Sequence, residues 1–163
     1  MENLARAKVY KLIPSVDACA PELESFMPVY NEAENGSIVL SFANAPLGFE
    51  VRSDEVRFEE YKKMEERQGN SVSPDFTGFE VADSNGVWYP AEFAIGGTDG
   101  KLNCIMIKSK QVKRPVAARY GWYNYGPVTI YGKNELPLCP FRTNSESGTD
   151  KTEHAKIQQI MTV

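Results

Sequence analysis

Residues 114–144 read R-P-V-A-A-R-Y-G-W-Y-N-Y-G-P-V-T-I-Y-G-K-N-E-L-P-L-C-P-F-R-T-N, and they begin with the regular alternation of a β-strand. Over residues 116–123, apolar side chains alternate with a second set that contains Arg119. A period of two is typical of a strand whose faces differ, so we expect one face in an apolar core and the other against a more polar layer. The residues expected to face the core are Val116, Ala118, Tyr120 and Trp122.

A long loop follows this strand, because Gly, Asn and Pro interrupt the pattern after Tyr123. The loop is rich in Tyr, Leu and Phe, so we expect it to lie folded over a sheet, tied there by hydrogen bonds from Arg119 and Arg142. At its end, P-F-R-T predicts a clamp at the end of a strand. In this clamp Phe141 is buried, Arg142 is paired with a carboxylate or with loop carbonyls, and Thr143 returns the chain.

Shorter alternating segments recur along the chain and predict further strands. Residues 37–42 alternate clearly, with Ile38, Leu40 and Phe42 inward. Pro90 lies within the run 87–95 and places that strand at an edge or at a bulge, because proline cannot donate a hydrogen bond to a neighbouring strand. The other strands are expected at 49–51, 78–82 and 102–107, with Asn35-Gly36 as a hairpin signal and 14–28 as a connecting stretch.

These segments predict a mainly β fold, an antiparallel β-sandwich with short terminal helices. The helices are expected at residues 4–12 and after Asp150, where Glu153 completes a capping box. Residues 53–73 carry the densest charge and predict a solvated excursion that contains a helical turn or two.

The composition limits the function classes. The chain has 163 residues, 42% hydrophobic and 25% charged, which fits one globular domain. A net charge of −4 argues against a nucleic-acid partner or an anionic membrane surface, and no apolar run reaches the length of about 18 residues needed to span a bilayer. No signal-peptide pattern opens the chain, so the sequence assigns it to no compartment.

Neither a serine-hydrolase triad nor a metal site can be assembled from the sequence. A G-x-S-x-G elbow is absent, and the single histidine, His154, follows Asp150 in the polar tail. One His and three Cys without C-x-x-C spacing cannot supply a typical zinc site, and we expect Cys19, Cys104 and Cys139 to be buried or half-buried thiols. We therefore expect no catalytic residue, no metal and no cofactor.

The residues of 114–144 also resemble a known family. R-P-x-A-x-R-Y-x-W followed by Y-x-x-x-x-L-P-x-x-P-F-R-T-N is similar to the closing segment of the sialate O-acetylesterase family, carbohydrate esterases of the SGNH-hydrolase superfamily. That family shows roughly P-x-x-V-R-Y-A-W, then L-Y-N, then G-L-P-A-x-P-F-R-T-D. This chain departs from it at Ala118, Gly121, Glu135 and Asn144. The matching residues, interpreted as structural, are Pro115, Arg119, Tyr120, Trp122, Tyr131, Leu136, Pro137, Pro140, Phe141, Arg142 and Thr143.

Two further segments extend the resemblance. L-A-R-A-K-V-Y at residues 4–10 looks like the last helix of the family's catalytic domain, and G-F-E-V-A-D-S-N-G-x-W-x-P-A at 78–91 is similar to a hairpin of its C-terminal domain. The resemblance implies that residues 1–13 are a remnant of that helix and that 14–163 form one β-sandwich domain. It further implies a catalytic SGNH domain as partner, which removes O-acetyl groups from sugars with Ser and His residues outside this chain. Such parents are usually secreted, periplasmic or lysosomal.

A carbohydrate-binding module is the alternative interpretation. Aromatic rings stack on pyranose rings, and an arginine meets a carboxylate, so acetylated or sialylated glycans are candidate ligands. The candidate binding residues are Trp88, Tyr123, Tyr125 and Arg142. The opposing interpretation packs Trp88 and Trp122 inside the sandwich, where aromatic side chains of a chain this size usually lie. A stand-alone enzyme is a third class, which would need a mechanism that the sequence does not show.

Overall fold

The computed structural model describes residues 18–73, 76–96, 101–123 and 126–144. Its elements follow from the alternation seen in the sequence, and they are almost all strands. The strands are β1 (Glu22–Val29), β2 (Ser37–Ala43), β3 (Phe49–Val51), β4 (Phe79–Ala82), β5 (Trp88–Pro90), β6 (Glu92–Ile95), β7 (Cys104–Lys108), β8 (Ala117–Tyr120), β9 (Ile130–Gly132) and β10 (Phe141–Arg142). A helix, α3 (Glu55–Arg67), joins β3 to β4.

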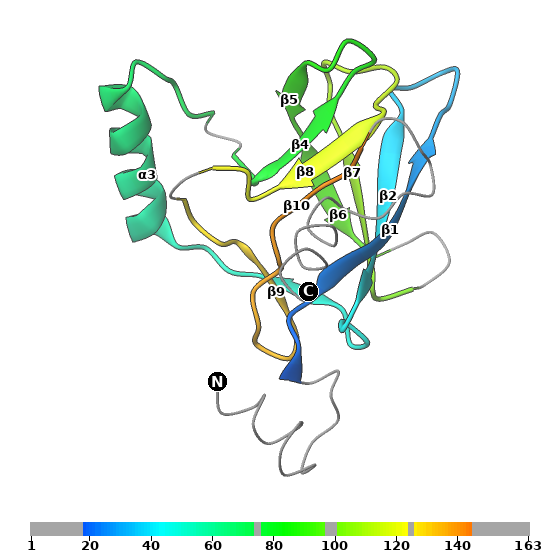
Figure 1. Cartoon of the computed structure of the whole chain (residues 1–163), viewed down its shortest axis with the longest axis horizontal. Coiled ribbons are helices and arrows are strands. Elements are labelled where there is room, and N and C mark those ends of the chain that lie inside the picture. Colours follow the sequence, from blue (N-terminus) through cyan, green and yellow to red (C-terminus); the bar gives the residue numbers. More distant parts are fainter. Residues whose placement is uncertain (1–17, 74–75, 97–100, 124–125, 145–163) are drawn as a thin grey trace, which may run out of the picture.

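The strands form two four-stranded sheets, ordered β1-β2-β7-β6 and β10-β8-β4-β5, and a two-stranded ribbon of β3 and β9 (Figure 1). Every pairing between these strands is antiparallel. Side chains from both four-stranded sheets meet in one apolar core, which contains Leu40 of β2, Ile107 of β7 and Val81 of β4. The expected mainly β, antiparallel class is therefore confirmed.

The alternation over residues 37–42 is confirmed by burial. Ile38 and Leu40 are fully buried and Phe42 is 1% exposed, whereas their neighbours on β2 are half-exposed. The two faces of a strand differ when one face packs on a core, so the alternating pattern was sufficient to predict the strand here.

Residues 14–28 were expected to be a connecting stretch, and for residues 22–28 this expectation was wrong. β1 occupies Glu22–Val29 and pairs with β2, with a shift of register between Leu23 and Ser25. Leu23 and Phe26 both face the core although they are three residues apart, because the irregularity shifts the alternation by one residue. Pro28 fits this strand, because β1 lies at the edge of its sheet.

The run 87–95 was expected to be one strand, but the structure divides it. β5 is the edge strand of one sheet and β6 is the edge strand of the other, so the expected edge position of Pro90 is confirmed. Ala91 forms the corner between them, with its N–H donated to the Phe79 carbonyl at 2.9 Å and its side chain buried in the core.

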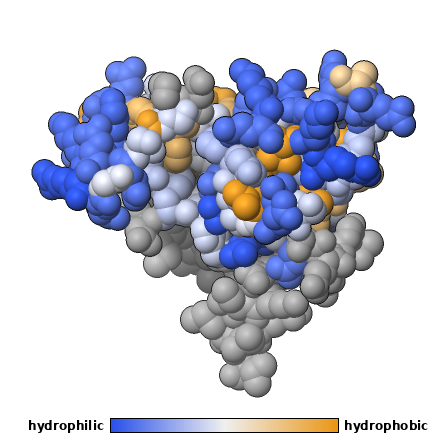
Figure 2. All heavy atoms as spheres, turned by 90° about the horizontal axis from the view of Figure 1, so that it is seen from above, coloured by the Kyte–Doolittle hydropathy of each residue, from blue (hydrophilic) through white to orange (hydrophobic). Residues whose placement is uncertain are grey.

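Residues 53–73 contain a longer helix than expected, because aromatic contacts anchor one side of it. The Asp54 carboxylate accepts a hydrogen bond from the Arg57 N–H at 3.0 Å and caps the N-terminus of α3. Tyr61 is the buried residue of the helix, and its ring lies 5.2 Å from that of Phe76 and 5.4 Å from that of Tyr123. Phe58 is half-buried, with its ring 6.0 Å from that of Phe76. Most other side chains of α3 are exposed, and Figure 2 shows hydrophilic side chains gathered at the left.

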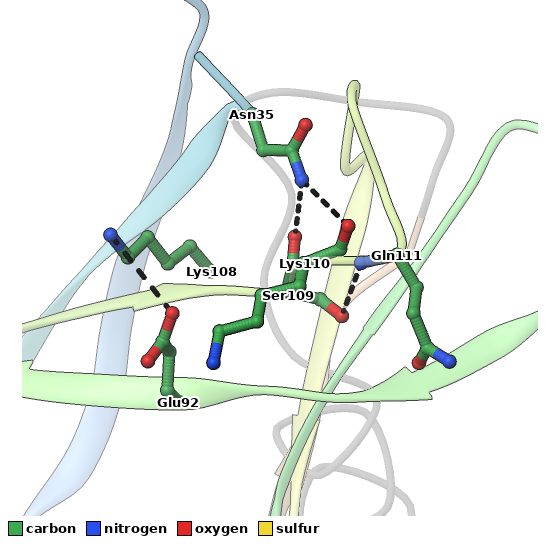
Figure 3. A network of polar contacts seen from close by, with 6 residues as sticks. All are labelled: Asn35, Glu92, Lys108, Ser109, Lys110 and Gln111. Carbon is green, nitrogen blue, oxygen red and sulfur yellow. Dashed lines mark hydrogen bonds and ion pairs between the residues drawn. The ribbon is translucent and has the colours of Figure 1, made fainter.

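Asn35 stabilises one end of the sandwich (Figure 3). Its amide donates hydrogen bonds to the carbonyls of Ser109 at 3.0 Å and Lys110 at 2.9 Å, which ties the loop before β2 to the loop after β7. Next to it, the Gly36 N–H is donated to the Lys113 carbonyl at 2.8 Å. The Asn35-Gly36 signal thus belongs to the β1–β2 hairpin, but within a longer connection than a two-residue turn.

The expected terminal helices at 4–12 and after Asp150, and the domain boundary at 13, lie outside the described residues. Within the part of the chain that the structure describes, no helix is long and apolar enough to cross a membrane.

Candidate functional site

The outer face of sheet β10-β8-β4-β5 gathers charged and aromatic side chains. The strand register places Arg142 of β10 opposite Arg119 of β8, and Arg119 opposite Glu80 of β4. Their neighbours Phe141, Tyr120 and Phe79 point the other way and are buried. Alternation along each strand therefore directs an apolar set into the core and a charged set outward.

Arg119 is held in place by two contacts on this face. Its Nε donates to Glu80 Oε2 at 2.6 Å, and its Cζ lies 4.3 Å from the ring centroid of Trp88. The side chains of Arg119 and Glu80 are 18% and 30% exposed, so the pair is partly screened from water. Arg119 was expected to tie the long loop to the sheet, but it instead joins β8 to its neighbour β4.

Arg142 lies near two indoles. Its Cζ is 5.5 Å from the ring centroid of Trp88 and 5.6 Å from that of Trp122, within the range of cation–π attraction. It was expected to pair with a carboxylate or with loop carbonyls. Among the described residues it makes no ion pair, and its contacts are the two rings. We call the set Glu80, Trp88, Arg119, Trp122 and Arg142 the Trp–Arg face.

Trp122 was expected in the core, and this was wrong. Its side chain is 45% exposed, and Trp88 is half-buried on the same outer face. The cause is Gly121, which follows the last residue of β8, has φ of 67° and donates its N–H to the Gly78 carbonyl. A left-handed residue reverses the chain direction, so the alternation that began at residue 116 ends at Tyr120.

Substitution of Trp122 by alanine is accordingly expected to have little effect on stability. The variant loses an exposed ring and one cation–π contact, which is worth about 0.5–1 kcal/mol at an exposed site. Thermal unfolding of wild type and variant measures this directly. A loss several times larger would show that the ring is buried in solution.

Tyr123 lies in a different cluster from the Trp–Arg face. Its ring packs 5.4 Å from those of Tyr61 and Phe76, and its hydroxyl donates to the Pro127 carbonyl at 2.7 Å. Burial raises the pKa of the Tyr123 phenol well above its usual range. Tyr123 therefore links α3 to the sheet. Of the predicted sugar-binding residues, Trp88 and Arg142 are the two that the described structure brings together. Tyr125 lies outside the described residues.

The other residues of the family motif lie in the core or in the loops around it. Pro115 is buried, and its carbonyl accepts a hydrogen bond from the Tyr30 hydroxyl at 2.9 Å. Tyr131 pairs with Pro137 through an isolated bridge and lies under the Arg52 guanidinium at 4.4 Å. The Leu136 carbonyl accepts from the Gly132 N–H at 2.9 Å, and Pro140 packs on Gly121. Tyr120, Phe141 and Thr143 are at most 2% exposed.

No catalytic arrangement is found among the described residues. Ser109 is buried, and its Oγ accepts a hydrogen bond from the Gln111 N–H at 3.3 Å. The single histidine, His154, falls outside the described residues. No group of three His, Cys, Asp or Glu in the described ranges could hold a metal ion.

Cys104 is buried and Cys19 and Cys139 are half-buried, and all three are free thiols. Burial, together with the nearby Glu22, raises the pKa of Cys139.

Glu80 is the residue of the face that sequence reasoning missed. It stands within the 78–82 strand, at a position that alternates with Phe79 and Val81, so its outward direction could be predicted. Its partner could not, because the pairing of β4 with β8 joins segments about forty residues apart, and only the folded register places Glu80 beside Arg119.

Comparison with known proteins supports the fold. No family model matches the chain, and no curated protein matches it. Among solved structures, the chain is similar to the crystal structure of XAC1771, described as a novel carbohydrate acetylesterase from Xanthomonas citri, with a TM-score of 0.57 and 23% sequence identity. The match covers 87% of this chain and 26% of that chain. The protein therefore has a fold related to one that makes up about a quarter of a carbohydrate acetylesterase.

Proposed function

We propose that this chain forms a non-catalytic β-domain of a carbohydrate O-acetylesterase of the sialate O-acetylesterase type, with a catalytic SGNH domain as its partner. The observation that carries the proposal is the asymmetry of the structural match. Nearly the whole chain aligns with about a quarter of a carbohydrate acetylesterase, which is the relation expected of an accessory domain. The P-F-R-T-N segment at 140–144 and the strand before it support the narrower assignment to the sialate type.

The described residues are consistent with a structural or substrate-positioning role. A serine nucleophile needs a base within hydrogen-bond reach and an acid that orients that base. Ser109, the buried serine of the described ranges, has the Gln111 N–H as its hydrogen-bond partner among the described residues. In this proposal the triad is supplied by the partner domain.

We therefore expect the purified chain to hydrolyse p-nitrophenyl acetate no faster than a heat-denatured sample of the same protein. The measurement is the rate of p-nitrophenol release at several protein concentrations. A rate that rises with native protein and disappears when one particular serine is replaced by alanine would contradict the accessory role. Co-expression with an SGNH-type catalytic domain of the same genome tests the partnership, and elution of the two as separate species would count against it.

A second candidate function is carbohydrate binding by the chain itself. The observation that favours it is the outward position of Trp88 and Trp122, which the structure excludes from the core. An exposed indole and a half-buried one next to an arginine provide stacking and hydrogen bonding to one ligand, as sugar-binding surfaces require. Saturable binding of a sugar to the isolated chain would establish this function independently of any esterase partner.

A further inference from the structure

We propose that the catalytic domain docks on the end of the sandwich at which the chain enters β1, against the exposed side chains of Leu47 and Leu102. This inference rests on the accessory-domain function proposed above, in which the catalytic domain precedes residue 14. It assigns to that partner a surface whose two leucines lie outside the family motif. We call this surface the entry end, and it is formed by residues 18–21, 44–48, 101–103 and 132–135.

The first support is the way the chain is held just before β1. Three successive carbonyls accept hydrogen bonds from other segments: that of Cys19 from Asn134 Nδ2 at 2.9 Å, that of Ala20 from Asn44 Nδ2 at 3.2 Å, and that of Pro21 from the Cys139 N–H at 3.0 Å. Free linkers keep their backbone groups in water, whereas these groups are bonded to the sandwich. Residues 19–21 therefore have a fixed position relative to the loops that surround them.

The second support is the short reach of the chain before that fixed point. Five residue-to-residue steps separate the expected end of the catalytic domain, at residue 13, from Ala18. A fully extended chain spans at most about 3.6 Å per step, so the end of the catalytic domain lies within about 18 Å of Ala18. This distance is smaller than the diameter of a small domain, which is about 30 Å. The catalytic domain is therefore placed beside the entry end.

The third support is the apolar surface at the same end. Leu47 is 61% exposed and Leu102 is 55% exposed. Their loops are in contact, because a β-carbon added to Gly48 would lie 3.4 Å from the Leu102 Cβ, and the Gly48 carbonyl accepts the Lys133 N–H at 3.1 Å. Figure 1 shows the loop from β2 to β3 and the loop after β9 at the lower end of the sandwich, where β1 begins. Neighbouring exposed apolar side chains are typical of an interaction surface.

A cleft next to Leu102 provides a place for a side chain of the partner. Its volume is about 340 Å³, and it is lined by Glu24 of β1, by Ala43 and Pro46, and by Leu102 and Asn103. Residues that contribute most to protein–protein binding are usually apolar or aromatic side chains inserted into such a cleft. The entry end thus combines exposed leucines, a cleft and a rigid chain entry at one end of the molecule.

The test measures the affinity of the full 163-residue chain for the SGNH-type catalytic domain of the same genome by isothermal titration calorimetry. We expect a complex with the wild-type chain. Leu47→Lys and Leu102→Lys should each weaken it roughly tenfold or more, because an ammonium group would be buried against an apolar partner surface. Both leucines are exposed in the isolated chain, so neither substitution should change its melting temperature appreciably.

Val87→Lys is the matched control. Val87 is 48% exposed and precedes β5, at the opposite end of the sandwich from the start of β1 (Figure 1). The substitution introduces the same charge on a similarly exposed apolar residue, and it should leave the affinity unchanged. A second comparison, Met27→Lys, places the charge on the exposed edge strand β1, where Met27 is 60% exposed. This variant should also bind like the wild type.

Three outcomes would overturn the inference. A complex that Leu47→Lys and Leu102→Lys weaken no more than Val87→Lys would keep the partnership and place its interface elsewhere. Weakening by Met27→Lys alone would assign the interface to the outer face of sheet β1-β2-β7-β6. Absence of a complex with the wild-type chain would reject the inference together with the accessory-domain function, and carbohydrate binding would be left to its own test.

Discussion

Replacement of Tyr120 by alanine is expected to lower the free energy of unfolding by about 3–5 kcal/mol, the usual cost of removing a large buried aromatic side chain. Tyr120 is 2% exposed, and its ring lies 4.6 Å from that of Phe79 and 6.2 Å from that of Phe141. The substitution leaves a cavity where the β4, β8 and β10 side chains meet. Because domains of this size are usually stable by about 5–15 kcal/mol, the variant should be close to unfolding at room temperature.

Urea denaturation followed by far-ultraviolet circular dichroism measures this loss. Tyr120→Phe is the matched control, since it keeps the ring and removes the hydroxyl, which accepts a long hydrogen bond of 3.4 Å from the Ile130 N–H. We expect this control to cost about 1 kcal/mol or less. A Tyr120→Ala variant as stable as the control would mean that the ring does not fill the core, and the packing described above would be wrong.

Replacement of Thr143 by valine is expected to destabilise the protein by about 1–3 kcal/mol, although the two side chains have almost the same shape. Thr143 is 2% exposed, and its Oγ1 accepts the N–H of Ala118 at 2.9 Å in the buried interior. Valine cannot accept this bond, so the Ala118 N–H loses its partner away from water. The cost of a buried, unsatisfied donor exceeds the benefit of the additional apolar group.

Thr143→Ser separates the hydroxyl from the methyl group. Serine keeps the acceptor for the Ala118 N–H and loses one methyl, so it should cost less than the valine variant. Chemical denaturation of the two variants under the same conditions shows whether the loss of the hydroxyl or the loss of the methyl group costs more stability. If valine proves as stable as wild type, the hydrogen bond contributes nothing net, and the role of Thr143 in closing the strand pair would be only steric.

The two residues on either side of Arg142 thus have a different role from Arg142 itself. Phe141 and Thr143 point inward and hold β10 against β8, and the alternation between them turns Arg142 out toward Trp88 and Trp122. The P-F-R-T segment was predicted as a clamp, and burial of Phe141 and Thr143 is what the structure shows. The expected pairing of Arg142 with a carboxylate or with loop carbonyls is not seen among the described residues, where its contacts are with aromatic rings.

Local sequence was sufficient where one segment alone contained the signal. The alternation at 37–42 and 78–82 predicted β2 and β4, because a strand with one buried face repeats its apolar residues every second position. Pro90 predicted an edge strand, since a missing N–H donor is tolerated only where no neighbouring strand needs its hydrogen bond. The mainly β class followed from these local signals together.

Only the tertiary structure decided the features that depend on a partner far along the chain. The register shift in β1 places its core residues three positions apart, so the sequence pattern does not indicate a strand there. The corner at Ala91 divides the segment 87–95 into two strands that belong to different sheets. Trp122 faces solvent because Gly121 ends the alternation with a positive φ, a conformation that neighbouring residue types do not reveal. The Trp–Arg face arises from strand pairings that bring β10, β8, β4 and β5 together, and the free energy that selects these pairings comes from burying both sheets against one core.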